Sequence, residues 1–478
     1  MSTFSGLNTA TTALWAQQRG LDVTGQNIAN VNTAGYTRQR AELQSVGGNV
    51  VPAVYAVSSQ VGQGVDADKV IRIRDAFLEG RAQIESASTA RMTAQDATLT
   101  QIEQAFREPG ETGIAAKLTA VFTAWGDVAN HPTENGARTA VLQKTATLVA
   151  ELHTTSGNLE KQWVQTRDSL GALAQDVNAK AQSIADLNTA IKRATQSGLP
   201  VNELSDKRDG LVLELSAAIG VTSSPGDDGQ VNVSVGGATL VAGGNALRLE
   251  AVDTQDPDTQ QVTATRFVTD PGGTTVAVDG TAGGKLSALN DTIPKYRERL
   301  DEVARSIAAE FNNAHMAGVD KNGVAGEPLF DDGSGDLPVD TAPGTSRITA
   351  ANLTLRFDDT DKFAAAALAT EGTATSDNRN AAALAQLQNA SDGAAVGYRS
   401  LIVKLGVDAS VATSNLKTQT VVAAQVDASR DSVSGVNLDE EMTNMLQFQH
   451  AYSAAARMIT AIDETLDVLI NRTGRVGL

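Results

Sequence analysis

Apolar side chains recur at every seventh position near both ends of the chain. The N-terminal series is Leu7, Leu14, Leu21 and Ile28, and the C-terminal series is Leu438, Met445, Tyr452, Ile459 and Leu466. A further series, three residues after members of the second, is Phe448, Ala455, Ile462 and Leu469. Because a seven-residue repeat keeps one apolar seam facing a supercoiling partner, the series predict two helices that pair. Periodicity alone leaves open two unrelated amphipathic surface helices.

The N-terminal helix is expected to be the weaker member of the pair. Thr11, Gln18 and Gly25 stand where apolar residues would complete its seam, and Gly20 also interrupts the segment. Each glycine inside a helix costs about 1 kcal/mol relative to alanine, whereas a buried leucine returns roughly 1.5–3 kcal/mol. We therefore expect the ends to gain order when further neighbours pack against them in an assembly.

Long helices are expected to fill most of the middle of the chain, where proline is rare. They cover about 74–106, 112–128, 134–197, 203–219, 285–315 and most of 378–434. Between 221 and 284 the composition changes to Gly, Thr, Val and Asp, and Val231–Val235 alternates as a strand does. A sharp turn is expected at 30–36, extended or irregular chain at 37–73, and a strand at 348–357.

These elements predict a mainly α protein with an inserted, small all-β domain. Its long helices form a rod-like bundle, and its N- and C-terminal helices pair as a coiled coil. The expected parts are an N-terminal segment at 1–60, a helical domain in three pieces at 61–219, 285–318 and 377–434, a β-rich insertion at 220–284, an irregular or β-hairpin excursion at 319–376, and a C-terminal helix at 435–478 that pairs with 1–35.

Charge and composition narrow the classes of partner. The 478 residues include 38 Lys and Arg against 56 Asp and Glu, which gives a formal charge of −18. Nucleic acid and anionic membranes are not expected as partners, because both bind basic patches. No cysteine is present, so thiol catalysis and disulfides are excluded. The first charged side chain is Arg19, so we expect no cleavable secretory signal, and no stretch has the roughly 20 apolar residues of a membrane span.

No residue pattern typical of an enzyme or a metal site is found. His131, His153, His315 and His450 lie far apart, and none has a second histidine three or four residues away. Asp320–Gly323 resembles part of a calcium loop, but no acidic residue closes it, so a tight turn explains it better. We therefore expect a protein that is not an enzyme, with no catalytic residue, no cofactor and no metal.

Acidic clusters and tryptophans are expected to be structural. Asp331-Asp332 and Asp439-Glu440-Glu441 each bring carboxylates together. The second cluster follows Asn437 at the start of the terminal helix, where acidic residues offset the positive end of the helix dipole. Trp125 and Trp163 lie on expected long helices, so we expect them in the core.

Two runs at the ends carry a resemblance to a known family. Ile28–Gln39, which contains Asn30, Asn32, Thr33, Gly35 and Tyr36, resembles the N-terminal signature of bacterial flagellar rod, hook and hook-associated proteins, and Ser434–Met442 resembles their C-terminal signature. Arg74–Leu78, Glu108-Pro109 with Trp125, and Asn202–Leu204 with Lys207–Asp209 are similar to one branch, the first hook-associated protein family of the hook–filament junction.

The resemblance implies a structural protein exported by the flagellar type III channel and placed outside the cell at the hook–filament junction. It implies a ring of identical subunits that contacts the hook protein, a second junction protein (hook-associated protein 3) and an export chaperone at the C-terminal helix. The implied inner-tube packing positions are Leu7, Leu14, Leu21, Ile28, Leu438, Met445, Phe448, Tyr452, Ile459, Ile462, Leu466 and Leu469. Asn30, Asn32, Thr33, Gly35 and Tyr36 would set the turn that leaves the tube.

Three alternative functions stay open at this point. A hook or distal rod protein shares such ends but has a mainly β middle, which the helical pattern at 134–197 disfavours. A secreted cell-wall hydrolase with axial-type ends would need a catalytic set that the sequence lacks. A cytoplasmic coiled-coil scaffold would be found inside the cell rather than in sheared flagella.

Overall fold

The computed structural model describes residues 3–46, 62–255, 262–337, 339–342, 345–367 and 376–472. The chain forms two compact units. We call Met1–Ala87, Asn178–Leu247 and Thr420–Leu478 the terminal unit, and Ser88–Val177 with Arg248–Gln419 the central unit. Helices α2 (Ala76–Phe106), α4 (Asn135–Gln196) and α9 (Ala394–Ser434) contribute residues to both units. The expected domain boundaries divide the chain differently and stay a prediction.

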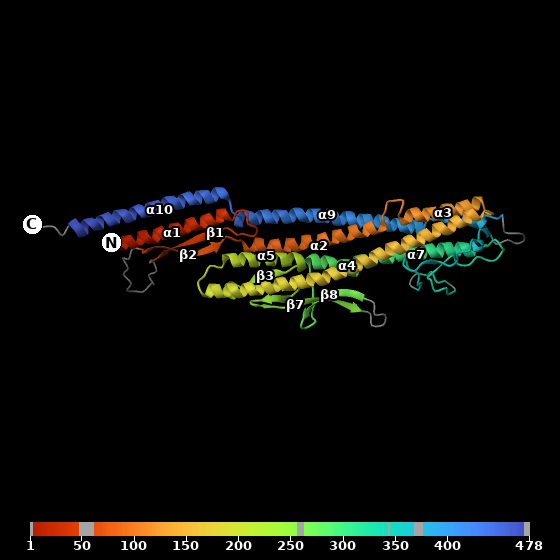
Figure 1. The fold of residues 1–478 in the computed structure, drawn as a ribbon, viewed down its shortest axis with the longest axis horizontal. Helices are drawn as coiled ribbons and strands as arrows, with labels where there is room; N and C mark the ends of the chain where they lie inside the picture. The colour runs from red at the N-terminus through yellow and green to blue at the C-terminus, as the bar shows by residue number, and fades with distance from the viewer. Residues whose placement is uncertain are drawn as a thin grey trace, which may run out of the picture. The chain divides into compact units, whose positions relative to one another are not determined.

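The terminal unit contains the expected pair of end helices. α1 (Thr3–Ala29) and α10 (Leu438–Asp467) lie side by side and run antiparallel (Figure 1). Strands β1 (Gln39–Val46) and β2 (Gly64–Arg72) form an antiparallel hairpin that packs along α1. The two strands lie in the stretch 37–73, where extended or irregular chain was expected; residues 47–61 lie outside the described part.

A small sheet completes the terminal unit. Strands β3 (Thr222–Pro225), β4 (Val231–Val235), β5 (Ala238–Ala242) and β6 (Asn245–Ala246) pair antiparallel in chain order. They follow α5 (Asn202–Ile219), which ends at Gly220 in the left-handed conformation that glycine adopts without strain. Asn188 of α4 anchors the sheet, because its amide bonds the backbone of Val231 and Gly243.

The central unit is a helical bundle around an aromatic core. Its elements are α3 (Ile114–Asn130), α6 (Gly280–Ser287), α7 (Ile293–Met316) and α8 (Arg379–Gln386), with parts of α2, α4 and α9. A five-residue π-helical turn at Ala288–Thr292 joins α6 to α7. Phe122 and Phe311 stack with ring centroids 5.5 Å apart, and Trp125 is fully buried beside Phe363, as expected for a core tryptophan.

The expected single β insertion proves to be two sheets in different units. Strands β7 (Arg248–Gln255), β8 (Val262–Asp270) and β9 (Thr275–Val276) form a separate three-stranded antiparallel sheet in the central unit. Asn290 anchors this sheet through two hydrogen bonds to the backbone of Thr265. The two sheets are thus bonded by different asparagines on different helices, a division that β-propensity cannot reveal.

The region after α7 is irregular, as expected, but most of its apolar residues are buried. The described part has four two-residue strands: β10 (Gly318–Val319), β11 (Phe330–Asp331), β12 (Thr354–Leu355) and β13 (Ala366–Ala367). The strand expected at 348–357 is wrong outside Thr354–Leu355. In the part that is not a strand, the backbone N–H of Ala350 donates to Asp301 and that of Thr349 donates to Asn352. Side chains thus take the place of a neighbouring strand as hydrogen-bond partners.

His315, at the end of α7, holds this region in place. Its Nδ1–H donates to the carbonyl of Glu327 at 2.6 Å, and its Nε2 accepts from the N–H of Ala364 at 2.9 Å. Burial lowers the pKa of His315 to about 4, because the charged ring would lose its water. His315 is therefore a neutral core residue.

Candidate assembly site at the chain ends

The pairing of α1 with α10 has a regular register. Asn27 contacts Glu441, Gly20 faces the ring of Phe448, and Gly6 faces Ile462. A step of seven or fourteen residues along one helix thus matches an equal step backward along the other, as in an antiparallel coiled coil.

Gly20 is a packing requirement of this pair. A Cβ at Gly20 would lie 2.7 Å from the ring of Phe448, which is closer than side-chain atoms approach. The sequence suggested that Gly20 only weakens the helix. Because Gly20 has no side chain, the large ring of Phe448 can pack against α1 at this position.

The expected seam residues are at most half-buried in the isolated chain. Those that are half-buried in the isolated chain are Leu7, Leu14, Leu21, Ile28, Met445, Phe448, Tyr452, Ile459, Ile462 and Leu466. Leu438 and Leu469 are exposed. The fully buried positions of the pair are mostly small or polar: Ala10, Ala16, Gly20, Val23, Thr24, Asn27, Glu441 and Ala455. The assignment of the seam residues to an inner tube stays a prediction.

Asn27 is the centre of a polar cluster that joins the two ends, although the sequence did not single it out. Its Nδ2 donates to the carbonyl of Gln39 and to Glu441, both at 2.9 Å. Its Oδ1 accepts from the Tyr36 hydroxyl at 2.8 Å and from the Gln39 N–H at 3.0 Å. Only 1% of Asn27 is exposed, so all four bonds form away from water, where each is costly to lose.

Arg38 completes this cluster, which we call the end clasp: Asn27, Tyr36, Arg38, Glu440 and Glu441. The Arg38 guanidinium bonds Glu441 and Glu440, each at 2.7 Å, and the Arg38 N–H donates to the carbonyl of Ser434. Glu441 is only 2% exposed, so removal of Arg38 would leave a buried carboxylate without its ion-pair partner. Burial, followed by the charges of Asp206, Glu441 and Glu203, raises the pKa of Tyr36 to about 12, which keeps its hydroxyl a donor.

The acidic cluster at the start of α10 therefore does more than was expected. The three acids lie in the first turn of α10, as expected, and Asn437 caps the helix by accepting from the N–H groups of Asp439 and Glu440. Glu440 and Glu441 also form the ion pairs of the end clasp. Arg38 stands in the N-terminal signature, and Glu440 and Glu441 stand in the C-terminal signature. Their presence in these two signatures was the feature of the sequence that could have indicated the pairing.

The remaining signature residues shape the turn after α1. Asn30 donates to the carbonyl of Gln26, and the Thr33 hydroxyl donates to Asn30. Gly35 has a φ of +76°, which glycine tolerates best, and the chain then returns Tyr36 toward Asn27. Asn32 is exposed, and its side chain has no hydrogen bond within the described residues.

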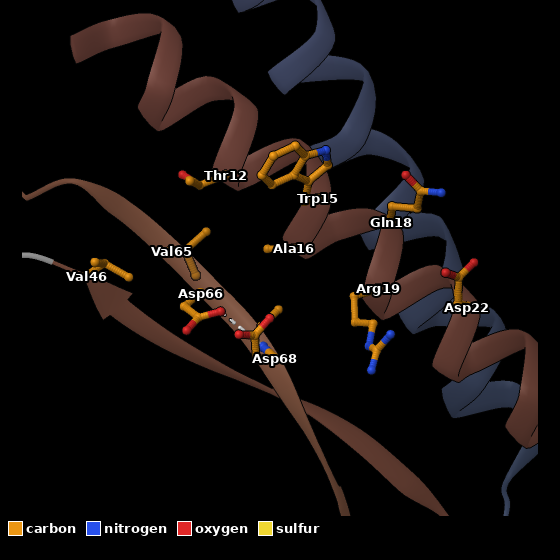
Figure 2. A pocket seen from close by; sticks show the side chains of 11 residues that line it. Thr12, Trp15, Ala16, Gln18, Arg19, Asp22, Val46, Val65, Asp66 and Asp68 are labelled. Atoms are coloured by element: carbon orange, nitrogen blue, oxygen red, sulfur yellow. Dashed lines mark hydrogen bonds between the residues drawn. The ribbon is translucent and has the colours of Figure 1, made fainter. Parts of the chain in front are cut away.

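A groove of about 530 Å³ lies between α1 and the β1–β2 hairpin (Figure 2). Trp15, Ala16, Val46 and Val65 contribute its apolar part, and Trp15 is 64% exposed. The polar residues along it are Thr12, Gln18, Arg19, Asp22, Asp66 and Asp68. Within the described residues, none of its three carboxylates forms an ion pair, so the groove is acidic and open.

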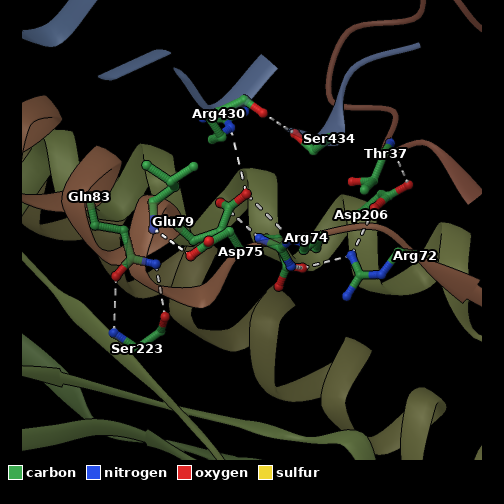
Figure 3. A network of polar contacts seen from close by, with 12 residues as sticks. Thr37, Arg72, Arg74, Asp75, Glu79, Gln83, Asp206, Ser223, Arg430 and Ser434 are labelled. Carbon is green, nitrogen blue, oxygen red and sulfur yellow. Dashed lines mark hydrogen bonds and ion pairs between the residues drawn. The ribbon is translucent and has the colours of Figure 1, made fainter. Parts of the chain in front are cut away.

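An arginine–carboxylate network lies beside the end clasp in the terminal unit (Figure 3). Arg72 bonds Asp206 and Asp209 at 2.8 Å each, and Arg74 pairs with Asp209 and Glu79. Burial disfavours the charge on Asp209, but Arg74, Arg208 and Arg72 outweigh it and lower the pKa. The network thus joins the end of β2 and the residues directly after it to α2 and α5.

Two further contacts extend the network. Arg430 of α9 lies 3.6 Å from Glu79, and Asp206 accepts from the N–H of Thr37, directly after the signature turn. A cavity of about 680 Å³ opens between the turn, α5 and the end of α9. The charged side chains that line this cavity are largely paired with one another. Such pairing is more typical of a contact that fixes neighbouring segments than of a reaction site.

Three further features concern metal ligands, membrane spans and the turn at Asp320. No group of three or more His, Asp or Glu side chains there is placed to hold a metal ion. No described helix is long and apolar enough to cross a membrane. Asp320 accepts from the N–H groups of Asn322 and Val324, as a tight turn requires.

Comparison with known proteins gives matches along the whole chain. Residues 99–330 match the family described as the helical domain of flagellar hook-associated protein FlgK. Residues 7–37 match the flagella basal body rod proteins, and residues 429–472 match the C-terminal family of the flagellar basal body rod proteins FlgEFG. The last two matches contain every residue of the end clasp except Arg38.

Full-length relatives and a solved structure agree with these matches. Flagellar hook-associated protein 1 of Bacillus subtilis is 31% identical over all of this chain and 99% of its own length. The Escherichia coli protein of that name is 28% identical over 97% of this chain and 99% of its own. The flagellar hook junction protein FlgK from Burkholderia pseudomallei aligns with a TM-score of 0.62 at 17% identity, covering 75% of this chain and 100% of that one, which shows a shared fold.

Proposed function

Because the chain belongs to the family of flagellar hook-associated protein 1, it is a structural component of the bacterial flagellum at the hook–filament junction, and we propose that its clasped ends are the part through which it assembles. The observation that carries the proposal is the end clasp. It joins the two family signatures through buried contacts and so presents α1 and α10 as one unit.

The outer face of the pair supports this role. Leu438, Met442 and Leu446 form an exposed stripe at intervals of four residues on α10, and Met458 is also exposed. Such a stripe is costly in water and is typical of a surface that a partner covers. Neighbouring copies in a tube would cover these side chains and the half-buried seam residues, from Leu7 to Ile28 and from Met445 to Leu466.

The partners follow from the place in the flagellum. We propose a ring of identical subunits with the hook protein on one side and a second junction protein, hook-associated protein 3, on the other. We also propose that the chain leaves the cell through the flagellar type III channel without losing a signal peptide, and that a chaperone holds α10 until then. The exposed apolar stripe on α10 supports a chaperone, because it would promote aggregation in a free subunit.

A gene deletion with complementation tests the proposal. The deletion strain should form hooks without filaments and release flagellin into the medium. The wild-type gene should restore filaments, and Arg38→Glu should not, because it places a third acid against Glu440 and Glu441. Leu199→Ser, an exposed change away from the clasp, is the matched control and should restore filaments. Normal filaments on the deletion strain would refute the proposal.

A further inference from the structure

The groove beside α1 continues beyond the part shown in Figure 2. A second cavity of about 350 Å³ shares Arg19 and Asp22 with it and reaches the turn at residues 200–204. The two cavities together follow α1 from Thr12 to Gln26, a length of about 21 Å at 1.5 Å per residue. We call them the α1 groove. It is long enough to lie against about four turns of another helix.

The α1 groove carries an excess of negative charge. Asp22, Asp66 and Asp68 are exposed, and they have no ion-pair partner within the described residues. Glu203 adds a fourth carboxylate, and Arg19 is the only cation among the described residues that line the groove. Such a surface favours a partner that has a cation and no acids of its own, because like charges across an interface repel.

The side of α10 that faces away from α1 has this complementary character. Residues 442–462 contain no acid, and Arg457 is their one charged side chain. Leu446 and His450 are each two residues from Phe448, which packs on α1, and two residues turn a helix by about 200°. They therefore lie on the opposite side of α10. We call the exposed residues along this side the outer stripe: Met442, Leu446, His450, Ala454 and Arg457.

The outer stripe and the α1 groove lie at the same height along the pair of end helices. Gly20 faces Phe448, and the two helices run antiparallel. Trp15, five residues before Gly20, is therefore level with Ser453, five residues after Phe448. By the same count, the groove spans the height of residues 442–456. Copies in a closed ring are related by rotation about one axis, so helices that run along that axis meet at equal height.

We propose that the outer stripe of α10 in one copy docks in the α1 groove of the next copy around the ring. This inference rests on the proposed function, because it needs a ring of identical subunits, and it needs no copy above or below that ring. The contact joins two different surfaces, so it repeats from copy to copy and closes a ring instead of ending at a dimer. It brings Arg457 beside the carboxylates of the groove, and it sets the exposed ring of Trp15 against the small side chains of Ser453 and Ala454.

Disulfide trapping in assembled flagella tests the docking. The native chain has no cysteine, so two introduced cysteines give unambiguous cross-links. A chain with both Gln18→Cys in the groove and His450→Cys in the outer stripe should form a ladder of dimers, trimers and larger multimers after mild oxidation. Each substitution alone should give no dimer, because a groove meets a stripe and not another groove. The matched control combines Gln18→Cys with Glu464→Cys, which is exposed on α10 about 21 Å from residue 450, and should give several-fold less.

Each outcome of this trapping has a definite meaning. A ladder from the first pair of cysteines alone supports the docking. Equal ladders from both pairs, or no ladder in flagella that contain the protein, would overturn it. A dimer from Gln18→Cys alone would show that two grooves meet, and a bond only within one chain would show that the stripe reaches its own groove, so either result also refutes the docking. Absence of the wild-type chain from sheared flagella would refute the proposed function, whereas incorporation without a cross-link refutes the docking alone.

A charge exchange gives a second readout. Arg457→Glu in the chain with both cysteines should reduce the yield of multimers several-fold, because it brings an acid to an acidic groove. Asp66→Lys should restore the yield, since Asp66 follows Gly64, which lies against Thr12 near the height of Arg457. Arg193→Glu makes the same change of charge at an exposed site of α4 in the terminal unit, and this control should leave the yield unchanged. Failure of the combined change to restore the multimers would contradict charge complementarity as the basis of docking.

Discussion

The central and terminal units are held together by different kinds of contact. In the central unit, large side chains such as Trp125, Phe311 and Tyr296 are fully buried against several helices. In the terminal unit, α1 and α10 meet through glycine, alanine and a buried amide–carboxylate cluster, while many of their leucines remain half-exposed. The central unit has a complete hydrophobic core within the chain. The terminal unit has contacts that align its two end helices and keeps apolar side chains that the chain does not cover. This difference is what an assembling protein requires.

The largest effect is expected from a core change in the central unit. Phe311→Ala removes a fully buried ring that stacks on Phe122, and we expect a loss of about 4 kcal/mol in the free energy of unfolding. Urea unfolding followed by tryptophan fluorescence in a Trp15→Phe background would report this unit alone, since Trp125 and Trp163 both belong to it. Unchanged unfolding of this unit would contradict the comparison of the two units.

The pH dependence of the central unit should come next in size. Because the pKa of His315 is about 4 when folded and 6.5 otherwise, the unfolded chain takes up a proton first as the pH falls. The stability that neutral His315 provides is complete above pH 6.5 and is lost toward pH 4. The loss amounts to about 3 kcal/mol, at 1.36 kcal/mol per pKa unit.

His315→Gln should be less stable at pH 7.5 and should lose this part of the pH dependence. The measurement is urea unfolding of both proteins at several values between pH 4 and 7.5. Carboxylates contribute equally to both proteins, so the difference between the two curves isolates His315. Parallel curves would show that His315 does not remain neutral in the fold.

The terminal unit should respond to a break in the end clasp. Glu441→Ala leaves Arg38 without its buried partner and one N–H of Asn27 without an acceptor. Arg38 keeps Glu440 and reaches water, so we expect about 2 kcal/mol, less than the roughly 3–5 kcal/mol for a fully buried pair. Hydrogen exchange of the α1 and α10 amides measures this, and the central unit should be unaffected. Unchanged protection of both helices would show that the end clasp does not stabilise the pair.

The sequence predicted the elements better than their contacts. The heptad series, the caps and the proline positions placed most helices within a few residues, because these signals are local. The bonds from Asn27 and Arg38 to Glu441 join positions about 400 residues apart, so no local pattern could show them. The division of the β region escaped for the same reason, since Asn188 and Asn290 look like ordinary polar residues on helices.

The smallest expected effect is the sharpest test of how α1 meets α10. Gly20→Ala gains about 1 kcal/mol of helix propensity, but its Cβ would lie 2.7 Å from Phe448. Overpacking costs about 1–3 kcal/mol, so we expect a net loss of about 1 kcal/mol. Gly25→Ala has nothing within 4 Å of the new Cβ and should stabilise α1. The two substitutions, on one helix, should therefore have opposite signs in amide exchange. If both stabilise the pair equally, Phe448 does not pack on Gly20, and the register assigned to α1 and α10 is wrong.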